Sequence, residues 1–303
     1  MVPGLDSASP GRIAVVGGGA VGGLLAQAAH RAGRVVTLCV RSEVTRLEIA
    51  VDGRFEAVPV EIVADPESQG PAEWILLATK AQDTPGAAPW LKRLIGPGSK
   101  VVILQNGIEH RERVRPYSAD AQLLPALVYA AIERVAPGRI IHHQGDLIAV
   151  PDSPLGAAFA DLLKGGGLTI RLENDFTTAA WRKLLGNIAG NPLTALTLRR
   201  VEVLRDPGIR RLAIGLLDEA VAVAQSEGAA LTQEDAQMAL DVYGTYKDSI
   251  GSSMLYDRLA GLPLEHDHLT GALVRRADRR GVPVPLNKAI LALLDALSAP
   301  HPL

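Results

Sequence analysis

The sequence has one cysteine, few aromatic residues and no long apolar run. Cys39 is the single cysteine among 303 residues, so no intrachain disulfide can form and no cysteine-rich metal site exists. No segment approaches the ~20 apolar residues of a membrane-spanning helix. Residues 1–11 also lack the apolar core of a signal peptide, and they predict a flexible N-terminal tail. We therefore expect a cytoplasmic protein that does not associate with membranes.

An excess of charge of either sign is also absent. Thirty-one Lys and Arg against 33 Asp and Glu give a net charge of -2, which offers no electrostatic basis for binding nucleic acid. The histidines of IHHQ (141–144) and of EHDH (265–268) point to different sides of a strand or a helix. We therefore expect no metal site, and we expect a small molecule as the partner.

What is present divides into two halves. Up to about residue 170, short apolar runs alternate with helical segments, which indicates a parallel sheet covered on both faces. These runs are RIAVVG (12–17), RVVTLCV (34–40), EWILLAT (73–79), KVVILQ (100–105) and RIIHH (139–143). The predicted fold class is α/β, with a Rossmann-type doubly wound parallel sheet that binds NADP over residues 12–173.

Past residue 175 the β-rich runs stop and helical patterns take over. The predicted helices cover residues 177–198, 208–227, 233–247, 267–280 and 286–298. Thr232 and Asp235 form a predicted N-terminal capping box, and Gly228 and Gly281 are predicted C-terminal stops. Residues 174–303 are thus expected to form an all-helical, substrate-binding domain.

A glycine-rich turn links the first predicted strand to the first helix. In GGGAVG (17–22), Gly17, Gly19 and Gly22 fill the pattern G-x-G-x-x-G. This spacing allows a tight turn, close approach of a pyrophosphate and close packing of helix on strand. A plain turn is the alternative, but the flanking strand and helix favour a dinucleotide site. The expected cofactor contacts in this motif also include Gly18, Ala20 and Val21.

The ends of the following strands indicate which dinucleotide binds. NAD-selective sites usually place Asp or Glu about 20 residues after the glycines, where it holds the ribose hydroxyls. Arg41 stands at the end of the second strand instead, which favours the 2′-phosphate of NADPH; a solvated surface arginine is the alternative. Lys80, Gln82 and Asn106 follow the next two strands, at the sheet edge where ligands bind in open α/β folds.

A polar row interrupts the apolar helix predicted after the sheet. Lys183, Asn187 and Asn191 recur every four residues and so share one helical face, where Gly186 and Gly190 would let another backbone come close. An ammonium group can stabilise the charge that develops on a ketone oxygen during hydride transfer and then donate a proton. Neutral amides one and two turns away can bind the substrate. A solvent-facing stripe is the alternative, although asparagine is a poor helix former.

Together these motifs resemble the ketopantoate reductase (2-dehydropantoate 2-reductase) family. GGGAVG, ATKAQ, QNG, WRKLLGNIAGNPLTAL, SSML and GVPVPLN occur in the order seen in that family, over nearly the whole chain. The resemblance implies NADPH-dependent reduction of a 2-oxo acid in a cleft between two domains. It also implies a place in pantothenate biosynthesis.

The resemblance further implies roles for individual residues. Lys183 would be the general acid, with Glu265 near it and near the cofactor ribose, and Asn106 would lie where nicotinamide and substrate meet. The residues implied for the cofactor, besides the glycine motif, are Arg41, Lys80, Asn106, Ala130 and Glu265. The residues implied for the substrate are Asn106, Lys183, Asn187, Asn191 and Ser253.

Three positions depart from the family pattern and leave the substrate open. Ile250 stands where an asparagine that helps to bind substrate is common, Tyr256 replaces a usual glutamine, and Leu264 precedes Glu265 in place of a threonine. Ketopantoate is the expected substrate. The alternatives are a related reductase of a bulkier or more apolar oxo acid or imine, and a non-catalytic NADPH-binding sensor. A homodimer is an open alternative to a monomer.

Overall fold

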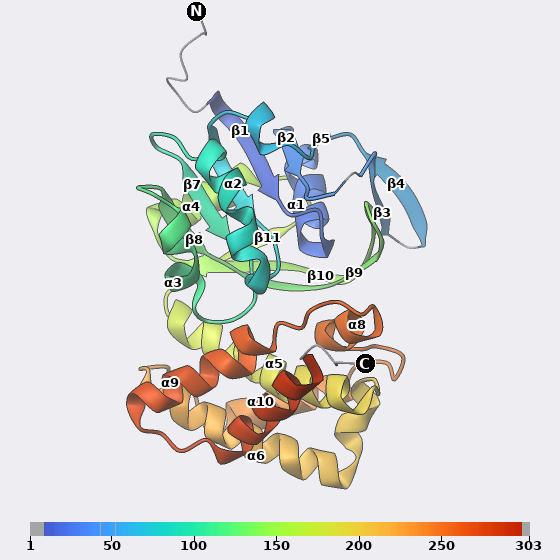
Figure 1. Ribbon diagram of the computed structural model, residues 1–303, viewed down its shortest axis with the longest axis vertical. Helices are drawn as coiled ribbons and strands as arrows, with labels where there is room; N and C mark the ends of the chain where they lie inside the picture. Colours follow the sequence, from blue (N-terminus) through green and yellow to red (C-terminus); the bar gives the residue numbers. More distant parts are fainter. Residues whose placement is uncertain (1–8, 43, 52, 299–303) are drawn as a thin grey trace, which may run out of the picture. The chain divides into compact units, whose positions relative to one another are not determined.

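The computed structural model describes residues 9–42, 44–51 and 53–298. The chain forms two compact units (Figure 1). Unit 1 holds the described residues up to Asn106 together with His110–Asn174, and unit 2 holds Gly107–Glu109 together with the described residues from Asp175 onward. The predicted class, a Rossmann-type sheet followed by helices, is confirmed. The NADP-binding and substrate-binding roles of the two regions stay predictions.

Unit 1 contains a six-stranded sheet in which every neighbouring pair is parallel. Its strands, in spatial order, are β5 (Glu61–Val63), β2 (Val35–Cys39), β1 (Ser9–Val16), β6 (Ala72–Leu77), β7 (Lys100–Ile103) and β8 (Gln122–Pro125). The chain runs outward from β1 first on one side and then, through β6, on the other. The carboxyl ends of β1 and β6 therefore flank the switch point at which open α/β sheets bind ligands.

Both faces of this sheet are buried, which explains the continuous apolar runs. Ile13 and Val15 of β1 lie in one core cluster, whereas Ala14 and Val16 lie in another. Successive strand residues point to opposite faces, so a strand with two covered faces needs an apolar residue at every position. The helices and short helical turns of unit 1 are α1 (Ala20–Arg31), η1 (Pro66–Ser68), η2 (Ala81–Asp83), α2 (Thr84–Leu94), α3 (His110–Val114), η3 (Arg115–Tyr117) and α4 (Pro154–Leu162).

A second sheet corrects one prediction about unit 1. It consists of β11 (Thr169–Glu173), β10 (Arg139–Pro151), β3 (Leu47–Val51) and β4 (Arg54–Val58), with β9 (Leu127–Ala136) antiparallel to β10. The run 139–143, expected in the parallel sheet, belongs to β10 here. The connection from β9 to β10 contains only Pro137 and Gly138, and Gly138 has a positive φ of 72°. Such a short connection makes a hairpin, because parallel strands need a long crossover.

The first strand begins earlier than expected. Residues 1–8 of the predicted tail lie outside the described residues, but residues 9–11 are part of β1. The backbone N–H of Gly11 donates to the Glu73 carboxylate at 2.7 Å. This hydrogen bond adds to the pairing of β1 with β6 and explains why the strand extends into the predicted tail.

Unit 2 is helical throughout its described residues. Its elements are α5 (Phe176–Thr197), η4 (Val201–Arg205), α6 (Pro207–Ser226), α7 (Gln233–Gly244), α8 (Ser253–Leu259), the π-helical turn η5 (Asp267–Gly271), α9 (Ala272–Arg280) and α10 (Pro285–Ser298). The capping box of Thr232 and Asp235 and the left-handed stop at Gly281 are confirmed. Helix α8 was not predicted, because seven residues are too few to show a clear period. None of the described helices is long and apolar enough to cross a membrane.

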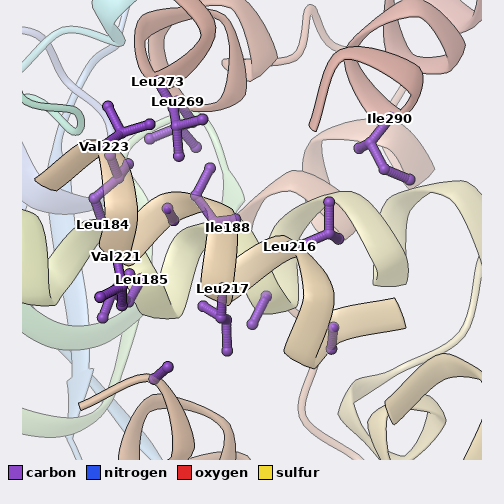
Figure 2. Packing of buried hydrophobic residues seen from close by; sticks show 14 of the residues in the cluster. Leu184, Leu185, Ile188, Leu216, Leu217, Val221, Val223, Leu269, Leu273 and Ile290 are labelled. Atoms are coloured by element: carbon purple, nitrogen blue, oxygen red, sulfur yellow. The ribbon is translucent and has the colours of Figure 1, made fainter. Parts of the chain in front are cut away.

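The core of unit 2 forms around α5 and α6. Leu184, Leu185 and Ile188 of α5 are almost fully buried, and Figure 2 shows them packed with Val221 and Val223 of α6. Leu184 and Ile188, four residues apart, share the face that is packed in the core, and successive helical residues are about 100° apart, so the row that begins at Lys183 is directed to another side of the helix. Core packing thus orients the polar face of α5.

Candidate active site

The glycine turn after β1 is shaped by close contacts. Gly17 has a φ of 114°, and a Cβ atom there would lie 2.8 Å from the backbone nitrogen of Thr79. A Cβ atom at Gly22 would overlap the carbonyl oxygen of Gly17. At Gly19, by contrast, no described atom lies within 4 Å of the Cβ position. Gly17 and Gly22 thus allow close packing of the chain on its own backbone, and Gly19 leaves open space at the N-terminus of α1.

Arg41 lies beside the connection that follows β6. Its side chain is 86% exposed, and its guanidinium is 3.6 Å from the carboxylate of Asp83 in η2. An ion pair this exposed contributes little to stability, in the range of 0–1 kcal/mol. The guanidinium therefore remains available to an incoming phosphate. Lys80, at the start of the same connection, is partly buried.

Gln105, a residue that the sequence analysis did not single out, joins the ends of β6 and β7. This side chain is only 4% exposed, and its amide nitrogen lies 2.9 Å from the hydroxyl oxygens of Thr79 and Thr84 and 3.3 Å from the carbonyl oxygen of Lys80. Its own amide oxygen accepts from Arg113 at 3.0 Å. A buried amide with partners on both ends is rigid. The signal available in the sequence was a glutamine directly after an apolar strand.

Asn106 lies at a point where the chain changes units. Its carbonyl oxygen accepts from the guanidinium of Arg113 at 3.1 Å, and the side chain is partly exposed. Gly107, which follows, has a φ of 98°, a conformation that other residues adopt only with strain. The carbonyl oxygen of Asn106 is thus held within unit 1, and the chain then turns at a glycine.

Ala130 lies in the second sheet of unit 1, on β9. The β9–β10 register is irregular around it, because Gln144 pairs with Ala131 whereas Leu147 pairs with Tyr129. Gly145, with a φ of 82°, fills the irregularity, and a Cβ atom there would lie 3.2 Å from the Cα of Ala130. The cofactor role of Ala130 stays a prediction.

Lys183 and Glu265 come together within unit 2. Lys183 is half-buried on α5, and Glu265, 3% exposed, directly precedes the helix that begins at His266. Burial lowers the pKa of Lys183 from 10.5 to about 8, while the charge of Glu265 acts in the opposite direction and raises it. A lysine with such a pKa is mostly protonated at neutral pH yet gives up its proton readily. This is the electrostatic setting of a general acid.

The amides of the polar row continue along α5. Asn187 is partly exposed and Asn191 is 3% exposed. The amide nitrogen of Asn191 has no hydrogen-bond partner among the described residues, although burying a polar group without one is costly. Pro192, which lacks an N–H, interrupts the helical hydrogen bonds next to it. Both facts suit a helix segment that binds a polar ligand.

The two glycines beside the row have different surroundings. Both were expected to admit another backbone; a Cβ atom at Gly186 would meet no described atom within 4 Å, but the space at Gly190 is filled by the side chain of Tyr243, which a Cβ atom there would overlap. The hydroxyl of Tyr243 donates to the carbonyl oxygen of Gly186 at 2.8 Å. An aromatic ring, not a main chain, thus packs on this face of α5.

The structure places Ser252 rather than Ser253 against α5. The hydroxyl of Ser252 lies 2.7 Å from that of Thr194, and it also accepts from the N–H of Leu255 at 3.1 Å as the N-cap of α8. Ser253 is exposed on the first turn of α8. The substrate role of Ser253 stays a prediction.

The three positions that depart from the family pattern have different surroundings. Ile250 is partly exposed, and its carbonyl oxygen accepts from the N–H of Val201 at 3.0 Å. The hydroxyl of Tyr256 accepts from the N–H of Gly251 at 2.8 Å. Leu264 is 8% exposed and belongs to the core of unit 2. Leu264 is thus a packing residue, whereas Ile250 is not part of that core.

The histidines of the EHDH segment show no metal-binding arrangement. His266 pairs with Asp295 at 3.1 Å, and no group of three or more His, Cys, Asp or Glu within the described residues could hold a metal ion.

The parallel sheet, the glycine turn and the half-buried lysine together define the class of the protein: a nucleotide-dependent oxidoreductase with a Rossmann-type unit.

Comparison with known proteins places the chain within this class. The chain belongs to the ketopantoate reductase family: the family model "Ketopantoate reductase PanE/ApbA" matches residues 13–154 and its C-terminal counterpart matches residues 175–298. A 2-dehydropantoate 2-reductase from Caulobacter vibrioides is 37% identical over 94% of this chain and 98% of its own. The resemblance drawn from the motifs is confirmed, and the enzyme class is that of oxidoreductases acting on a CH–OH group.

Solved structures support the same family. A ketopantoate reductase from Ralstonia eutropha has a TM-score of 0.87 and 30% identity, with 95% of this chain and 98% of that chain covered. A ketopantoate reductase from Staphylococcus aureus has a TM-score of 0.86 and 26% identity over the same shares. Both units therefore follow the family fold.

Proposed function

We propose that this protein reduces 2-dehydropantoate (ketopantoate) to pantoate with NADPH, and that Lys183 is the general acid. The observation that carries the proposal is the pairing of a half-buried lysine, whose pKa is lowered to about 8, with the buried Glu265. The relatives named 2-dehydropantoate 2-reductase support the substrate. The alternatives remain a reductase of a bulkier oxo acid or imine and a non-catalytic NADPH sensor.

Residues of unit 1 fit the cofactor. The open space at Gly19, next to the N–H groups at the start of α1, suits a pyrophosphate. The exposed guanidinium of Arg41 suits a 2′-phosphate. Lys80 and Asn106, at the carboxyl ends of β6 and β7, would complete the site. When bound, NADPH supplies the hydride that adds to the ketone carbon.

Residues of unit 2 would then handle the proton and the substrate. As the carbonyl electron pair moves onto oxygen, the ammonium group of Lys183 stabilises the negative charge and transfers one proton, which leaves a neutral amine and an alcohol. Glu265 favours the protonated form of Lys183 before the transfer. The amides of Asn187 and Asn191 can hold the carboxylate and the hydroxyl of the substrate without competing for that proton.

Arg41→Ala is expected to weaken NADPH binding by roughly 10- to 100-fold, because a charge-assisted hydrogen bond is worth about 1.5–3 kcal/mol. NADH binding should barely change, since NADH lacks the 2′-phosphate. Fluorescence titration of both cofactors measures the difference. Equal losses for the two cofactors would show that Arg41 does not contact the phosphate.

Asp83→Asn is the matched control for this contact. Asp83 is the carboxylate that Arg41 faces, and a negative charge at that distance would oppose a phosphate. The asparagine variant should therefore bind NADPH more tightly than the wild type, with NADH unaffected. A loss of NADPH affinity in Asp83→Asn would mean that this carboxylate supports the site by holding Arg41 rather than opposing the phosphate.

A substrate panel tests the proposed reaction. NADPH absorbance at saturating cofactor should fall on addition of ketopantoate, with weaker selection than usual against hydroxyl-free acids such as 2-oxoisovalerate, because Ile250 offers no hydrogen bond. Ile250→Asn should improve the ratio of kcat/KM for the two acids by about 1 kcal/mol, or roughly fivefold, if the residue contacts substrate. Turnover of a larger oxo acid or imine without turnover of ketopantoate would favour the related-reductase alternative. No turnover of any compound would favour the sensor.

We also infer a homodimer for this chain. The related reductase from Staphylococcus aureus is described as dimeric, and the two chains align over nearly their full lengths. The proposed partners are thus a small 2-oxo acid and a second copy of the same chain.

A further inference from the structure

Three residues between the two parts of unit 1 belong to unit 2. The chain leaves unit 1 after Asn106, packs with unit 2 over Gly107–Glu109 and returns to unit 1 at His110. We call Gly107–Glu109 the crossing segment. Ile108 packs against the core of unit 2. The crossing segment is therefore held by a unit other than the one that holds its neighbours in sequence.

Glu109 binds the crossing segment to α9 through arginines. Its carboxylate lies 2.9 Å from the guanidinium of Arg275 and 3.2 Å from that of Arg279, with Arg276 at 3.9 Å. The Glu109 side chain is only 14% exposed. Although Arg275 and Arg279 are 40% and 57% exposed, a little-exposed carboxylate that accepts from both anchors the segment, because charge-assisted hydrogen bonds are roughly twice as strong as neutral ones.

Arg275 connects this anchor to the segment that carries Glu265. The guanidinium that binds Glu109 also binds the Asp267 carboxylate at 2.6 Å and the Asp267 carbonyl oxygen at 2.9 Å. Gly271 makes room for this contact, since a Cβ atom there would lie 2.6 Å from the Asp267 carboxylate. Asp267 begins the π-helical turn η5, two residues after Glu265. One arginine thus fixes the crossing segment and the turn beside Glu265.

Asn106 is therefore held from two directions. Within unit 1, Arg113 binds its carbonyl oxygen. On the other side the chain is anchored at Glu109, three residues later, with only Gly107 and Ile108 between them. If the anchor is released, the side chain of Asn106 loses one of the two constraints on its direction.

We propose that Glu109 is a positioning residue: its ion pairs with Arg275 and Arg279 hold the crossing segment on α9 and thereby fix Asn106 for catalysis. The kinetic part of this inference rests on the proposed function, in which Asn106 meets nicotinamide and substrate. The structural part, that Glu109 restrains the backbone at Asn106, stands without it.

The chain contains a matched control, a second carboxylate that binds arginines of α9. Glu227, 12% exposed, binds Arg276 at 3.1 Å and Arg280 at 2.5 Å. It lies at the C-terminal end of α6 and has no part in the crossing segment. Glu109→Gln and Glu227→Gln each remove one carboxylate from arginines of α9. A purely structural role for Glu109 predicts the same behaviour from both variants.

The test compares melting temperature and kinetics for the two variants with the wild-type chain. Both should melt at similarly lowered temperatures. Glu109→Gln should lower kcat by about 10- to 100-fold with a smaller change in KM, the order expected when a reacting group is displaced by about 1 Å. Glu227→Gln should keep kcat within about twofold. Equal kcat values for the two variants would overturn the proposal.

Two further variants separate positioning from direct catalysis and from misfolding. Because Glu109 acts through Asn106, Glu109→Gln should cost little more when Asn106 is already alanine, whereas Glu227→Gln should act independently of Asn106→Ala. Glu109→Asp keeps the charge and should recover part of the lost kcat. Additive losses for Glu109 and Asn106, or no recovery with aspartate, would contradict the proposal.

Hydrogen exchange decides the structural part if the proposed reaction fails. The amides of Asn106 and Gly107 should exchange at least about 10-fold faster in Glu109→Gln than in Glu227→Gln, because only the first variant releases the crossing segment. A wild-type chain that reduces no 2-oxo acid but shows this difference would refute the proposed function and keep the positioning role. Equal exchange in both variants would refute the positioning role, whatever the activity.

Discussion

Replacing Lys183 by alanine is expected to lower kcat by ~10²–10⁴-fold, the usual contribution of a positioned general acid. NADPH affinity should be kept, because Lys183 belongs to unit 2 whereas the glycine turn and Arg41 belong to unit 1. Stopped-flow reduction of ketopantoate and a fluorescence titration measure the two quantities. A kcat within a few-fold of the wild type would make Lys183 a structural residue and end the proposed mechanism.

Arg182→Ala is the matched control on α5. Arg182 precedes Lys183, is exposed and forms an ion pair with Asp235 at 2.9 Å. Its removal deletes a positive charge from the same turn without touching the polar row, so kcat should stay near the wild-type value. A large loss in Arg182→Ala would show that the charge of α5, and not the Lys183 ammonium, is what matters.

The pH profile gives the same prediction a second measurement. Lys183 must be protonated to act, so kcat/KM for reduction should fall as the pH rises through about 8, the lowered pKa of Lys183. Glu265 raises this pKa, so Glu265→Gln should move the fall to lower pH. A profile that is unchanged in Glu265→Gln would mean that another group titrates.

As the pH rises, the contribution of Lys183 should increase the folding stability, whereas the activity should decrease. Burial lowers its pKa from 10.5 to about 8, so the unfolded chain binds more protons than the folded protein between these values, and stability rises with pH across that window. Lys183→Met, which keeps most of the side-chain volume, should lose activity without losing stability and should abolish this pH dependence. Thermal unfolding at pH 7 and pH 10 measures this pH dependence of stability.

Replacement by alanine at two glycines of the first turn is expected to have different effects, on stability at Gly22 and on NADPH binding at Gly19. Gly22→Ala would force a methyl group onto the carbonyl oxygen of Gly17, so the protein itself should be destabilised by at least about 1–3 kcal/mol, as in overpacked sites. At Gly19 a methyl group meets no described atom, so Gly19→Ala should keep its melting temperature. It should still weaken NADPH binding by about 2 kcal/mol, or roughly 30-fold, since the methyl group occupies the space proposed for the pyrophosphate at a helix N-terminus.

Melting temperature without cofactor, followed by NADPH titration, distinguishes the two variants. Gly33→Ala serves as a control for glycine replacement in general, because Gly33 has a φ of 75° with no neighbour within 4 Å. It should lower stability through backbone strain and leave NADPH affinity unchanged. Unchanged NADPH affinity in Gly19→Ala would show that the pyrophosphate does not occupy that space.

Several features of the fold and of the candidate site follow from local sequence alone. The runs that became β1, β2, β6 and β7 are nearly continuous apolar segments because both sheet faces are covered, and the helical segments between them mark them as strands of a parallel sheet. The glycine turn and the polar row of α5 also depend on spacing within one or two turns of chain. The motifs in their order were enough to indicate the family.

Other features depend on contacts that no local pattern contains. The run 139–143 was expected in the six-stranded parallel sheet, yet it lies in the second sheet, where it pairs in parallel with β3 and, through a two-residue connection, forms a hairpin with β9. Gly190 looks like a place for a backbone, yet Tyr243 from another helix fills it. In each case the outcome depends on which distant element arrives, and a sequence window cannot contain that information.

The chemistry of the site is divided in the same way. That a lysine and two asparagines share a helical face is a matter of helix geometry. Three other features come from tertiary structure: the lowering of the pKa of this lysine to about 8, the contacts of Gln105 with two strand ends, and the binding of Glu109 by arginines of α9. Burial and long-range charge exist only after the chain has folded, and these two effects turn a pattern of polar residues into a candidate acid and its supports.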